Sequence, residues 1–331
     1  MKMIPLGSTD IKLSRMGLGT WAFGGGPAWN GDLDLQVCID TIVEAHRCGI
    51  NLIDTAPGYN FGNSEVIVGQ ALKKLPRNDI VVETKCGIVW ERTGSLFNKV
   101  GDRQLYKNLT PESIREEVEA SLQRLGIDTI DIYMTHWQSV EPCFTPIAET
   151  VDTLNALKKE GKIRSIGAAN VDAGHIREYL KHGELDIIQA KYSILDRALE
   201  GELLPLCRQN GIIVQVYSPL EQGLLTGTIG RDYVPGGARA NKVWFQRENM
   251  LRVMDMLEEW RPLCAKYHCT IPALALAWIL KQSDLITLLS GATSPEQVRE
   301  NTDALTIALT DEDSLSKCPS YMASSTILTT S

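Results

Sequence analysis

The chain lacks the long apolar segment of a membrane protein. A membrane-crossing helix needs roughly 18 to 20 consecutive apolar residues. The longest apolar run here, Ile271–Leu280, is shorter and contains Pro272. The first ten residues also lack the apolar core of a secretory signal. We therefore expect no membrane segment and a cytoplasmic location.

Paired cysteines and metal-ligand spacings are missing as well. The eight cysteines form no Cys-x-x-Cys pair, and the two closest, Cys264 and Cys269, are five residues apart. Four of the five histidines show no ligand spacing with one another or with the cysteines; they are His46, His175, His182 and His268. This scatter predicts reduced thiols, as in a cytosolic protein, and no metal site.

Positive charge is in deficit. The chain has 331 residues, with 33 Lys and Arg against 41 Asp and Glu, so its formal net charge is −8. An acidic surface repels phosphate backbones and anionic membranes, which makes nucleic acids and membrane surfaces poor partners. We expect a small molecule as the partner. These features carry no information on the oligomeric state.

What the chain does contain is a regular alternation. Short apolar runs, typical of parallel strands covered on both faces, alternate with longer amphipathic segments. The expected strands are Arg15–Thr20, Asn51–Thr55, Ile80–Lys85, Ile130–His136, Ile163–Asn170, Asp186–Ala190, Ile212–Tyr217 and Thr287–Ser290. The expected helices are Asp34–Cys48, Ser64–Lys74, Thr110–Leu125, Pro146–Glu160, Asp172–Lys181, Gly201–Gln209, Arg247–Tyr267 and Pro295–Leu305.

Eight strand–helix units without an intervening linker favour a single α/β domain, a (β/α)8 TIM barrel, over residues 1–331. The alternative is a doubly wound open sheet. Residues 1–14 are predicted to form a β-hairpin at the far end of the barrel, and residues 312–331 a polar, partly mobile tail. Three long loops follow predicted strands and would share the active-site face; they are Cys86–Leu109, Trp137–Thr145 and Ser218–Gln246.

The segment Gly17–Ala22 matches the dinucleotide-binding pattern G-x-G-x-x-A. That pattern binds a pyrophosphate only where its glycines open a helix. Here Phe23 is followed by three glycines and Pro27, which cannot continue a helix. We interpret the segment as a strand that leads into a glycine-rich loop.

Polar residues close three of the apolar strands. Asp54, Lys85 and His136 each stand at the C-terminal end of a predicted strand, and Tyr59 lies five residues after Asp54. In a barrel such positions are candidates for catalysis. Each residue alone has an ordinary structural explanation, but the four together are hard to obtain by accident. They predict one catalytic group.

The four side chains have complementary chemistry. A tyrosine, with a pKa of about 10, is a weak acid at neutral pH. The Lys85 ammonium is predicted to lower the pKa of Tyr59, and Asp54 to keep Lys85 charged. A neutral His136 can donate a hydrogen bond to a carbonyl oxygen. The group would polarise and protonate a carbonyl that receives a hydride.

The motifs around these residues resemble those of the aldo-keto reductases. The four residues lie in Leu52-Ile53-Asp54-Thr55-Ala56-Pro57-Gly58-Tyr59, Glu83-Thr84-Lys85 and Thr135-His136-Trp137. The similarity continues through Gly19–Trp21, Ile166–Asn170, Gln189, Tyr217–Leu220 and Gln297–Asn301, so it covers nearly the whole chain. It implies that Tyr59 is the proton donor, that Lys85 and Asp54 tune it, and that His136 orients the carbonyl.

The same resemblance implies an extended nicotinamide cofactor across the loop face. Asn170 and Gln189 would bind its carboxamide, and Tyr217 would stack on the nicotinamide ring. The substrate pocket would be lined by Trp21, Tyr59, His136 and Trp137. Further cofactor contacts are implied for Trp21, Ser218, Leu220, Gly223, Gly291, Thr293, Gln297, Glu300 and Asn301, the last two at the adenine. Ala169 departs from the family, which usually has a serine there, and removes one expected cofactor hydrogen bond.

The segment Gly223–Gly227, with the loop up to Gln246, resembles a clamp over the cofactor; the alternative is a surface insertion. Arg231, Lys242 and Arg247 are candidates to meet the pyrophosphate.

The last loop and helix indicate which cofactor is preferred. Family members that bind a 2′-phosphate carry basic side chains where this chain has Gly291 or Thr293, and Gln297. Each missing charged hydrogen bond weakens phosphate binding by about 1.5 to 3 kcal/mol. We therefore predict a preference for NADH, with NADPH possible. Arg299 is the one nearby cation, and we interpret it as a solvated surface charge.

These observations predict an NADH-preferring reductase of small aldehydes and ketones. The segments His136-Trp137 and Tyr217–Gly223 resemble a bacterial branch that acts on methylglyoxal, which implies similar 2-oxoaldehydes as substrates. Two alternatives use the same residues: a redox-sensing regulatory subunit that binds cofactor, and an alcohol dehydrogenase that works in the oxidative direction. Next to Lys85, Cys86 is either an acidic, oxidisable thiol or a buried inert one, and strand alternation favours the latter.

Overall fold

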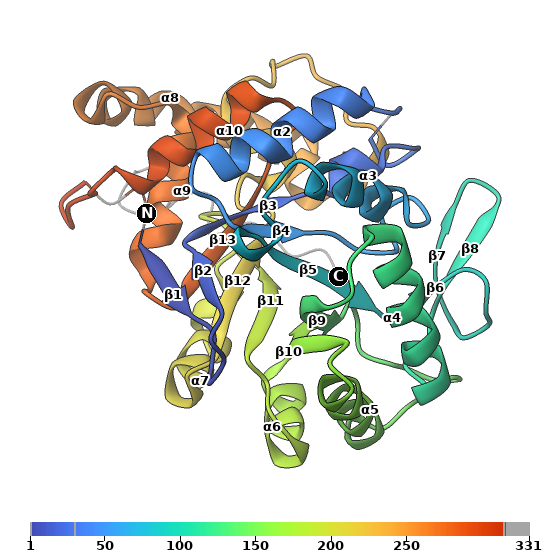
Figure 1. Ribbon diagram of the computed structural model, residues 1–331. Helices are drawn as coiled ribbons and strands as arrows, with labels where there is room; N and C mark the ends of the chain where they lie inside the picture. The colour runs from blue at the N-terminus through green and yellow to red at the C-terminus, as the bar shows by residue number, and fades with distance from the viewer. Residues whose placement is uncertain (1, 30, 314, 316–331) are drawn as a thin grey trace.

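Eight parallel strands close into a barrel in this computed structural model, which describes residues 2–29, 31–313 and 315 (Figure 1). The (β/α)8 prediction is confirmed, and the open-sheet alternative is wrong. The barrel strands are β3 (Met16–Gly19), β4 (Leu52–Asp54), β5 (Val81–Cys86), β9 (Ile130–Thr135), β10 (Ile163–Ala169), β11 (Ile187–Lys191), β12 (Ile213–Tyr217) and β13 (Ile286–Gly291). The predicted tail, residues 312–331, lies almost entirely outside the described residues.

A ring of helices covers the outside of the barrel (Figure 1). They are α2 (Leu35–Arg47), α3 (Asn63–Leu72), α4 (Pro111–Leu125), α5 (Ile147–Lys159), α6 (Ala173–His182), α7 (Leu203–Asn210), α9 (Ile271–Gln282) and α10 (Pro295–Thr302). Local sequence sets their limits. Thr110 caps α4 before Pro111, and Gly126 ends it with a φ of 65°.

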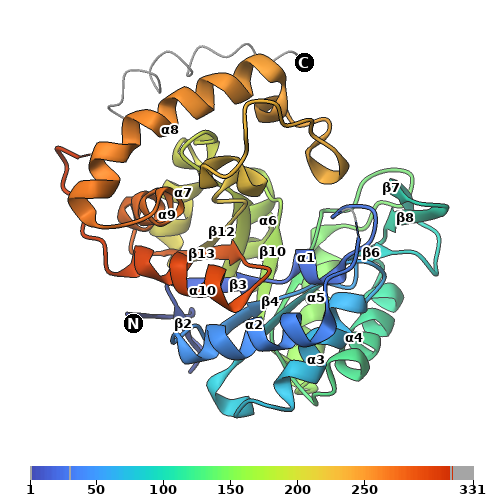
Figure 2. The same ribbon diagram turned by 90° about the horizontal axis from the view of Figure 1, so that it is seen from above.

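The seventh helix of the barrel is α9, which the sequence analysis missed. The sequence predicts α8 (Arg247–Tyr267) in this place, but α9 packs against β13, whereas α8 packs against α9 at the outer edge (Figure 2). The error has a physical cause. Helix α9 is apolar nearly all round and therefore shows no amphipathic period, as expected of a helix buried on most sides. Thr270 caps it and Pro272 occupies its first turn, where proline is tolerated.

Two predicted loops contain regular structure. Residues 86–109 include a three-stranded antiparallel sheet of β6 (Ile88–Val89), β7 (Ser95–Val100) and β8 (Arg103–Lys107), which projects from the barrel (Figure 1). Most of β7 is exposed, so it lacks the apolar alternation that marks a strand. Residues 218–246 include three short 3-10 helices, at Glu221–Thr226, Gly237–Arg239 and Val243–Phe245.

The glycine-rich segment after β3 forms one helical turn, α1 (Trp21–Gly24), where the sequence predicted only a loop. The turn stops because Gly25 and Gly26 both have positive φ, 71° and 74°. No long helix therefore starts at these glycines, and the dinucleotide-binding alternative fails as predicted.

The barrel interior has two layers of different chemistry. At the N-terminal end, the hairpin of β1 (Met3–Pro5) and β2 (Lys12–Ser14) buries Ile4, Leu6 and Leu13 against apolar strand residues; these are Leu52, Val81, Ile132, Ile187 and Ile213. The predicted closure of the far end is confirmed. Toward the C-terminal end, the interior becomes polar, with Asp54, Glu83, Gln189 and Gln215 all buried.

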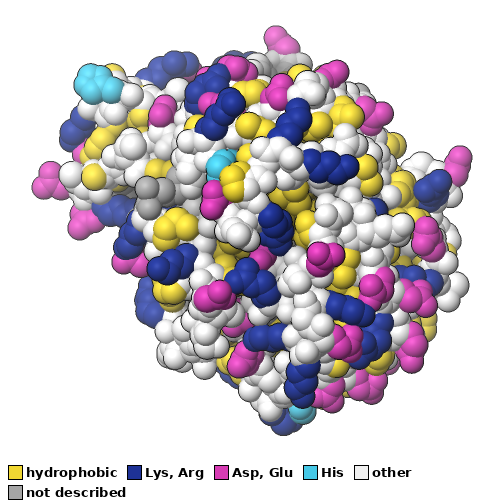
Figure 3. Space-filling model, in the orientation of Figure 1, with side chains coloured by type: hydrophobic (Ala, Val, Ile, Leu, Met, Phe, Trp, Pro, Cys, Tyr) yellow, Lys and Arg dark blue, Asp and Glu magenta, His cyan; other side chains and the backbone are white. Residues whose placement is uncertain are grey.

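Acidic and basic side chains are interspersed over the face seen in Figure 3. Within the described part of the chain, no single helix is long and apolar enough to cross a membrane. Helices α8 and α9 pass that test only as a pair, and the break between them bends by 83°.

Candidate active site

The four predicted catalytic residues meet at the C-terminal mouth of the barrel. Asp54 ends β4, Lys85 lies near the end of β5, His136 follows β9, and Tyr59 comes from the loop after β4. The Lys85 ammonium donates hydrogen bonds to Asp54 Oδ1 and to the Thr55 carbonyl oxygen, and its Nζ lies 3.2 Å from Tyr59 Oη. The rings of Tyr59 and His136 pack edge to face, with their centroids 5.8 Å apart.

Charge and burial fix the protonation of two members of this group. Burial opposes the charged form of Lys85, but negative charge nearby, that of Asp54 first, outweighs burial and raises the pKa of Lys85 above its ordinary value. Burial and the nearby Lys85 charge hold the pKa of His136 well below 6.5. The site therefore contains a charged lysine and a neutral imidazole at neutral pH, as the sequence predicted.

Lys85 lowers the pKa of Tyr59, as predicted, but the net shift of this pKa is upward. Burial and the Asp54 carboxylate raise the pKa of Tyr59 above its ordinary value of 10, and the opposing effect of Lys85 is smaller. The sequence identified the ammonium but gave no measure of how completely the phenol is desolvated. The phenol is therefore protonated at neutral pH, the form that can donate a proton, but its raised pKa makes it a weaker acid than a free tyrosine.

A cleft of about 1190 Å³ opens above this group. Its lining includes Tyr59, His136 and every predicted cofactor or pocket residue, namely Trp21, Trp137, Asn170, Gln189, Tyr217, Ser218, Leu220, Gly223, Gly291, Thr293, Gln297, Glu300 and Asn301. Lys85 is fully buried and lies beneath the cleft surface. Residues from opposite halves of the chain thus line one cleft.

Asn170 and Tyr217 form the wall beside His136. Asn170 has a φ of 55°, a conformation that asparagine tolerates better than most residues. Its Nδ2 donates to the His136 carbonyl oxygen at 2.9 Å, and its Oδ1 accepts from Tyr217 Oη at 2.8 Å. These bonds hold the Tyr217 ring at the cleft.

The part of the cleft around Tyr59 is aromatic. Trp21 packs edge to face on Trp29, with ring centroids 5.0 Å apart, and its ring lies 6.3 Å from that of Tyr59. Across the cleft, the ring of Trp137 packs against that of Phe97 of β7, with the ring centroids 5.6 Å apart. Both Trp29 and Phe97 were missed by the sequence analysis, because neither lies in a recognisable motif. Only the fold of the β7–β8 hairpin brings Phe97 over the barrel.

The loop after β12 holds one cation that sequence reasoning missed. Arg239 lines the cleft, donating from Nε to the Gln222 carbonyl oxygen at 2.8 Å and from Nη1 to Tyr233 Oη at 2.9 Å. Lys242 also lines the cleft. Arg231 and Arg247 do not: Arg231 pairs with Asp255, and Arg247 donates to the Arg231 carbonyl oxygen. The two residues are held in surface contacts, which corrects their suggested role.

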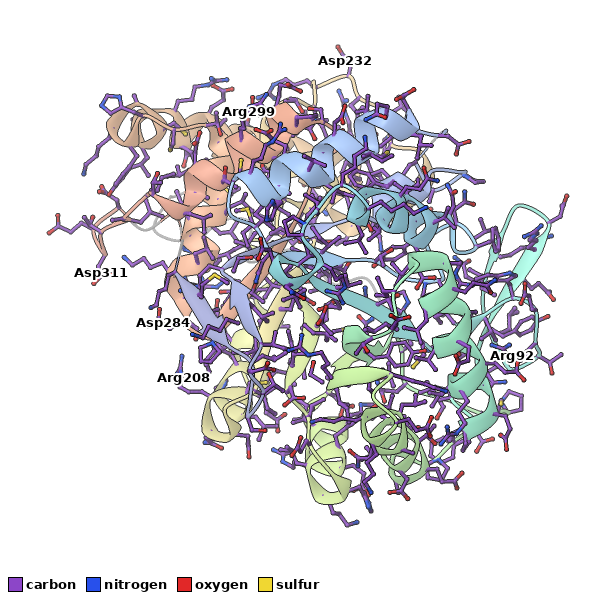
Figure 4. The ribbon with its side chains drawn as sticks, viewed as in Figure 1. Arg92, Arg208, Asp232, Asp284, Arg299 and Asp311 are labelled. Atoms are coloured by element: carbon purple, nitrogen blue, oxygen red, sulfur yellow. The ribbon has the colours of Figure 1, made fainter. Side chains whose placement is uncertain are left out.

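No basic side chain of the last loop and helix lines the cleft. Gln297 Oε1 accepts hydrogen bonds from the Thr293 backbone N–H at 2.9 Å and from its hydroxyl at 3.2 Å. Arg299 points outward between α10 and α2, where it donates to Glu44 and Glu296 at 2.8 and 2.7 Å (Figure 4). Arg299 is therefore a surface charge, as predicted.

Cys86 is fully buried, and burial and Glu117 raise its pKa well above 9. The expectation of an inert thiol is confirmed, and the alternative of an acidic thiol is wrong. Among the described residues, no cluster of three or more His, Cys, Asp or Glu could hold a metal ion.

Comparison with known proteins agrees with this geometry. The sequence profile of the aldo/keto reductase family matches residues 15–317. The chain belongs to the aldo/keto reductase family. It is 86% identical over 313 residues to the NADH-specific methylglyoxal reductase of Escherichia coli K12, covering 95% of this chain and 96% of that one. It is 35% identical to the aldo-keto reductase YhdN of Bacillus subtilis, over 95% and 91% of the two chains.

Solved aldo-keto reductases have the same architecture. The glycerol dehydrogenase AKR11B4 from Gluconobacter oxydans superposes with a TM-score of 0.84 at 34% identity, covering 96% of each chain. An aldo-keto reductase from Klebsiella pneumoniae, solved in complex with NADPH, gives a TM-score of 0.71 at 27% identity, over 96% of this chain and 94% of that one.

The cleft fits the nicotinamide cofactor that this family implies. At its inner end the Tyr217 ring offers a stacking surface, and the buried His136 Nδ1 has no partner among the described residues. Arg239 and Lys242, which carry positive charge, also line the cleft, as do the hydrogen-bonding side chains of Glu300 and Asn301. A dinucleotide with a charged pyrophosphate needs both kinds of group.

Proposed function

We propose that this protein is a cytoplasmic, NADH-dependent reductase of small aldehydes and ketones, with methylglyoxal and similar 2-oxoaldehydes as substrates. The contact of a protonated Tyr59 with the Lys85–Asp54 pair, at the mouth of a cofactor-sized cleft, carries the proposal. The 86% identical NADH-specific methylglyoxal reductase supports the substrate class. The described cysteines are all free thiols, which supports a reducing compartment.

Each catalytic side chain then has one task. Reduced nicotinamide supplies the hydride that the carbonyl carbon accepts. Tyr59 Oη donates a proton to the carbonyl oxygen as that oxygen gains negative charge. The neutral His136 ring donates a hydrogen bond to the same oxygen and orients it. Lys85, held charged by Asp54, stabilises the phenolate that remains on Tyr59.

The cleft residues would hold the cofactor along its length. Asn170 and Gln189 bind the carboxamide, Tyr217 stacks on the nicotinamide ring, and Glu300 and Asn301 contact the adenine. A preference for NADH is supported by the last loop and helix, because their basic side chain, Arg299, does not line the cleft. Burial raises the pKa of Tyr59, so its hydroxyl is protonated at neutral pH and can donate a proton to the carbonyl oxygen.

The test is the variant Tyr59→Phe, which removes the hydroxyl and keeps the ring. We expect turnover of methylglyoxal to fall by about 100-fold or more, the usual contribution of a general acid. The dissociation constant of NADH, measured by fluorescence titration, should change less than about threefold, because the ring contacts remain.

Tyr133→Phe is the matched control. Tyr133 is also buried, and its pKa is also raised, but it does not line the cleft. This variant should turn over methylglyoxal at the wild-type rate. Full activity of Tyr59→Phe would refute the assignment, and tighter binding of NADPH than of NADH by the wild type would refute the cofactor preference.

A further inference from the structure

A hydrogen-bonded layer of four buried side chains lies directly beneath the Lys85 ammonium. Asp54, Glu83, Gln189 and Gln215 come from β4, β5, β11 and β12 and all face the barrel interior. Barrels usually fill this space with branched apolar side chains, as the lower layer of this one does. A polar layer that spans four strands needs a reason beyond packing, because buried polar groups are costly unless they are paired.

Glu83 connects the members of this layer. Its Oε1 accepts a hydrogen bond from Gln189 Nε2 at 2.9 Å, and its Oε2 accepts one from Gln215 Nε2 at 3.0 Å. Gln189 Nε2 also lies 3.0 Å from Asp54 Oδ1 and 2.7 Å from Gln215 Oε1. The amide of Gln189 is therefore held by two carboxyl groups, those of Asp54 and Glu83, and its position depends on Glu83.

Sheet register places Glu83 beside Asp54. The two residues are direct partners across the β4–β5 pair, and Lys85 follows Glu83 on the same face of β5. On its other side Glu83 is paired with Ile132 of β9, which carries no charge. The charged or titratable groups around Glu83 are therefore Asp54, Lys85 and Tyr59, while β11 and β12 contribute the neutral Gln189 and Gln215.

We propose that Glu83 is a positioning residue for the reduction, which fixes Asp54 and Gln189 beneath Lys85 and so holds the ammonium in contact with the Tyr59 hydroxyl. This inference rests on the proposed function, because it assigns Glu83 a part in the proton transfer from Tyr59. Glu83 does not line the cleft, so it acts through its neighbours and not on the substrate.

The protonation of Glu83 is part of this role. Burial and the adjacent Asp54 carboxylate raise the pKa of Glu83 well above 4.5, since two neighbouring carboxyl groups do not both ionise readily in a buried site. A neutral Glu83 leaves one carboxylate opposite one ammonium. Ionised Glu83 would add a negative charge near Tyr59, raise the pKa of Tyr59 further and weaken it as an acid.

Glu83→Gln tests the proposal, because an amide keeps the size of the carboxyl group and one of its two acceptor oxygens but cannot ionise. At neutral pH we expect kcat for methylglyoxal within about threefold of wild type. At alkaline pH, wild-type kcat should fall as Glu83 ionises. In the variant, kcat should begin to fall at a pH about half a unit or more higher. Replacement of a residue with a purely structural role would not shift the pH at which kcat falls.

Glu83→Leu removes the hydrogen bonds and keeps a similar volume. We expect kcat to fall by about tenfold or more, since Gln189 and Asp54 lose a buried partner, with KM for methylglyoxal nearly unchanged. Glu117→Gln is the matched control. Glu117 is a buried carboxyl that accepts a hydrogen bond from the Gly87 N–H, outside the polar layer. The variant Glu117→Gln should have the kcat of wild type, and its kcat should fall at the same alkaline pH.

Two results would overturn the proposal. One is a Glu83→Gln profile that superimposes on that of wild type. The other is a loss of neutral-pH activity in Glu83→Gln as large as in Glu83→Leu, which would mean that the carboxylate charge is required. If Glu83→Leu does not fold, as judged by circular dichroism, the profile of Glu83→Gln still decides. Full activity of Tyr59→Phe would instead mark failure of the proposed function itself.

Discussion

At Tyr59, burial and charge act in opposite directions. The Lys85 ammonium favours the phenolate, whereas desolvation and the Asp54 carboxylate favour the phenol. The last two effects outweigh that of Lys85, so the pKa is raised. The identities of the charged neighbours were predictable, because each closes a strand that the apolar pattern reveals. The net shift of the Tyr59 pKa was not predictable, because it depends on how completely the residues around the barrel mouth exclude water.

At Glu117, the effect of burial on a pKa can be tested through the free energy of unfolding. Burial raises its pKa from 4.5 to about 8. The folded protein therefore keeps a proton on Glu117 that the unfolded chain loses above pH 4.5. Its contribution to the free energy of unfolding is complete below that pH and declines as the pH rises to about 8, by at most about 1.4 kcal/mol per unit.

The variant Glu117→Gln should remove this decline. We expect its free energy of unfolding in urea to fall less than that of wild type between pH ~5 and pH ~8, and the difference in slope is the quantity to measure. Glu116→Gln, an exposed change on the same helix, should keep the wild-type slope. Parallel curves for wild type and Glu117→Gln would contradict a protonated Glu117 at neutral pH.

Among the elements, those with one buried face were predictable from their sequence period. Helices such as α2 and α4 present an apolar stripe and end at clear signals. Helix α9 and the β7–β8 hairpin were not predicted from the sequence, for opposite reasons. The first is buried on most sides and the second is largely exposed, so neither alternates between apolar and polar residues.

The end of β13 and the start of α10 carry a prediction about cofactor choice. A Cβ added at Gly291 meets no atom within 4 Å, so a side chain fits there without strain. Gly291→Lys should bind NADPH about tenfold or more tighter than wild type, because it restores one charged hydrogen bond to the 2′-phosphate. Affinity for NADH should change little. Fluorescence titration with both cofactors measures the ratio.

The uncharged variant Gly291→Gln is the control for this change and should leave the ratio of the two affinities as it is in wild type. Arg299→Ala should leave it unchanged as well, since Arg299 is held by Glu44 and Glu296 outside the cleft. A Gly291→Lys protein that still discriminates against NADPH as strongly as wild type would show that the 2′-phosphate lies elsewhere.

For the whole molecule, counting strand–helix units was enough to predict closure of the barrel, whereas its interior required the register of the strands. Glu83 and Gln215 lie in predicted strands, and alternation puts Glu83 on the same face as Lys85, but nothing in the linear sequence indicates that the two residues join Asp54 in one layer. Register follows from the stagger of all eight strands around the barrel, which local patterns do not contain.

The closed end of the barrel separates stability from activity. Leu13 of β2 is fully buried against the apolar layer, on the opposite side of the barrel from the cleft. Leu13→Ala should lower the free energy of unfolding by about 2 to 5 kcal/mol and leave kcat and KM unchanged well below the unfolding temperature. Met3→Ala, at a partly exposed position of the same hairpin, should cost less than about 0.5 kcal/mol. An altered KM for NADH in Leu13→Ala would contradict this separation.

The projecting hairpin of β7 and β8 has a consequence for how new activities arise. It supplies Phe97 to the aromatic wall, while the reactive groups are anchored in or directly after barrel strands. Diversification of this hairpin therefore changes which molecules enter the enzyme without disturbing the machinery that transforms them. A library restricted to residues 95–107 would explore new specificities at little risk to folding, and natural descendants of this gene have the same evolutionary route open to them.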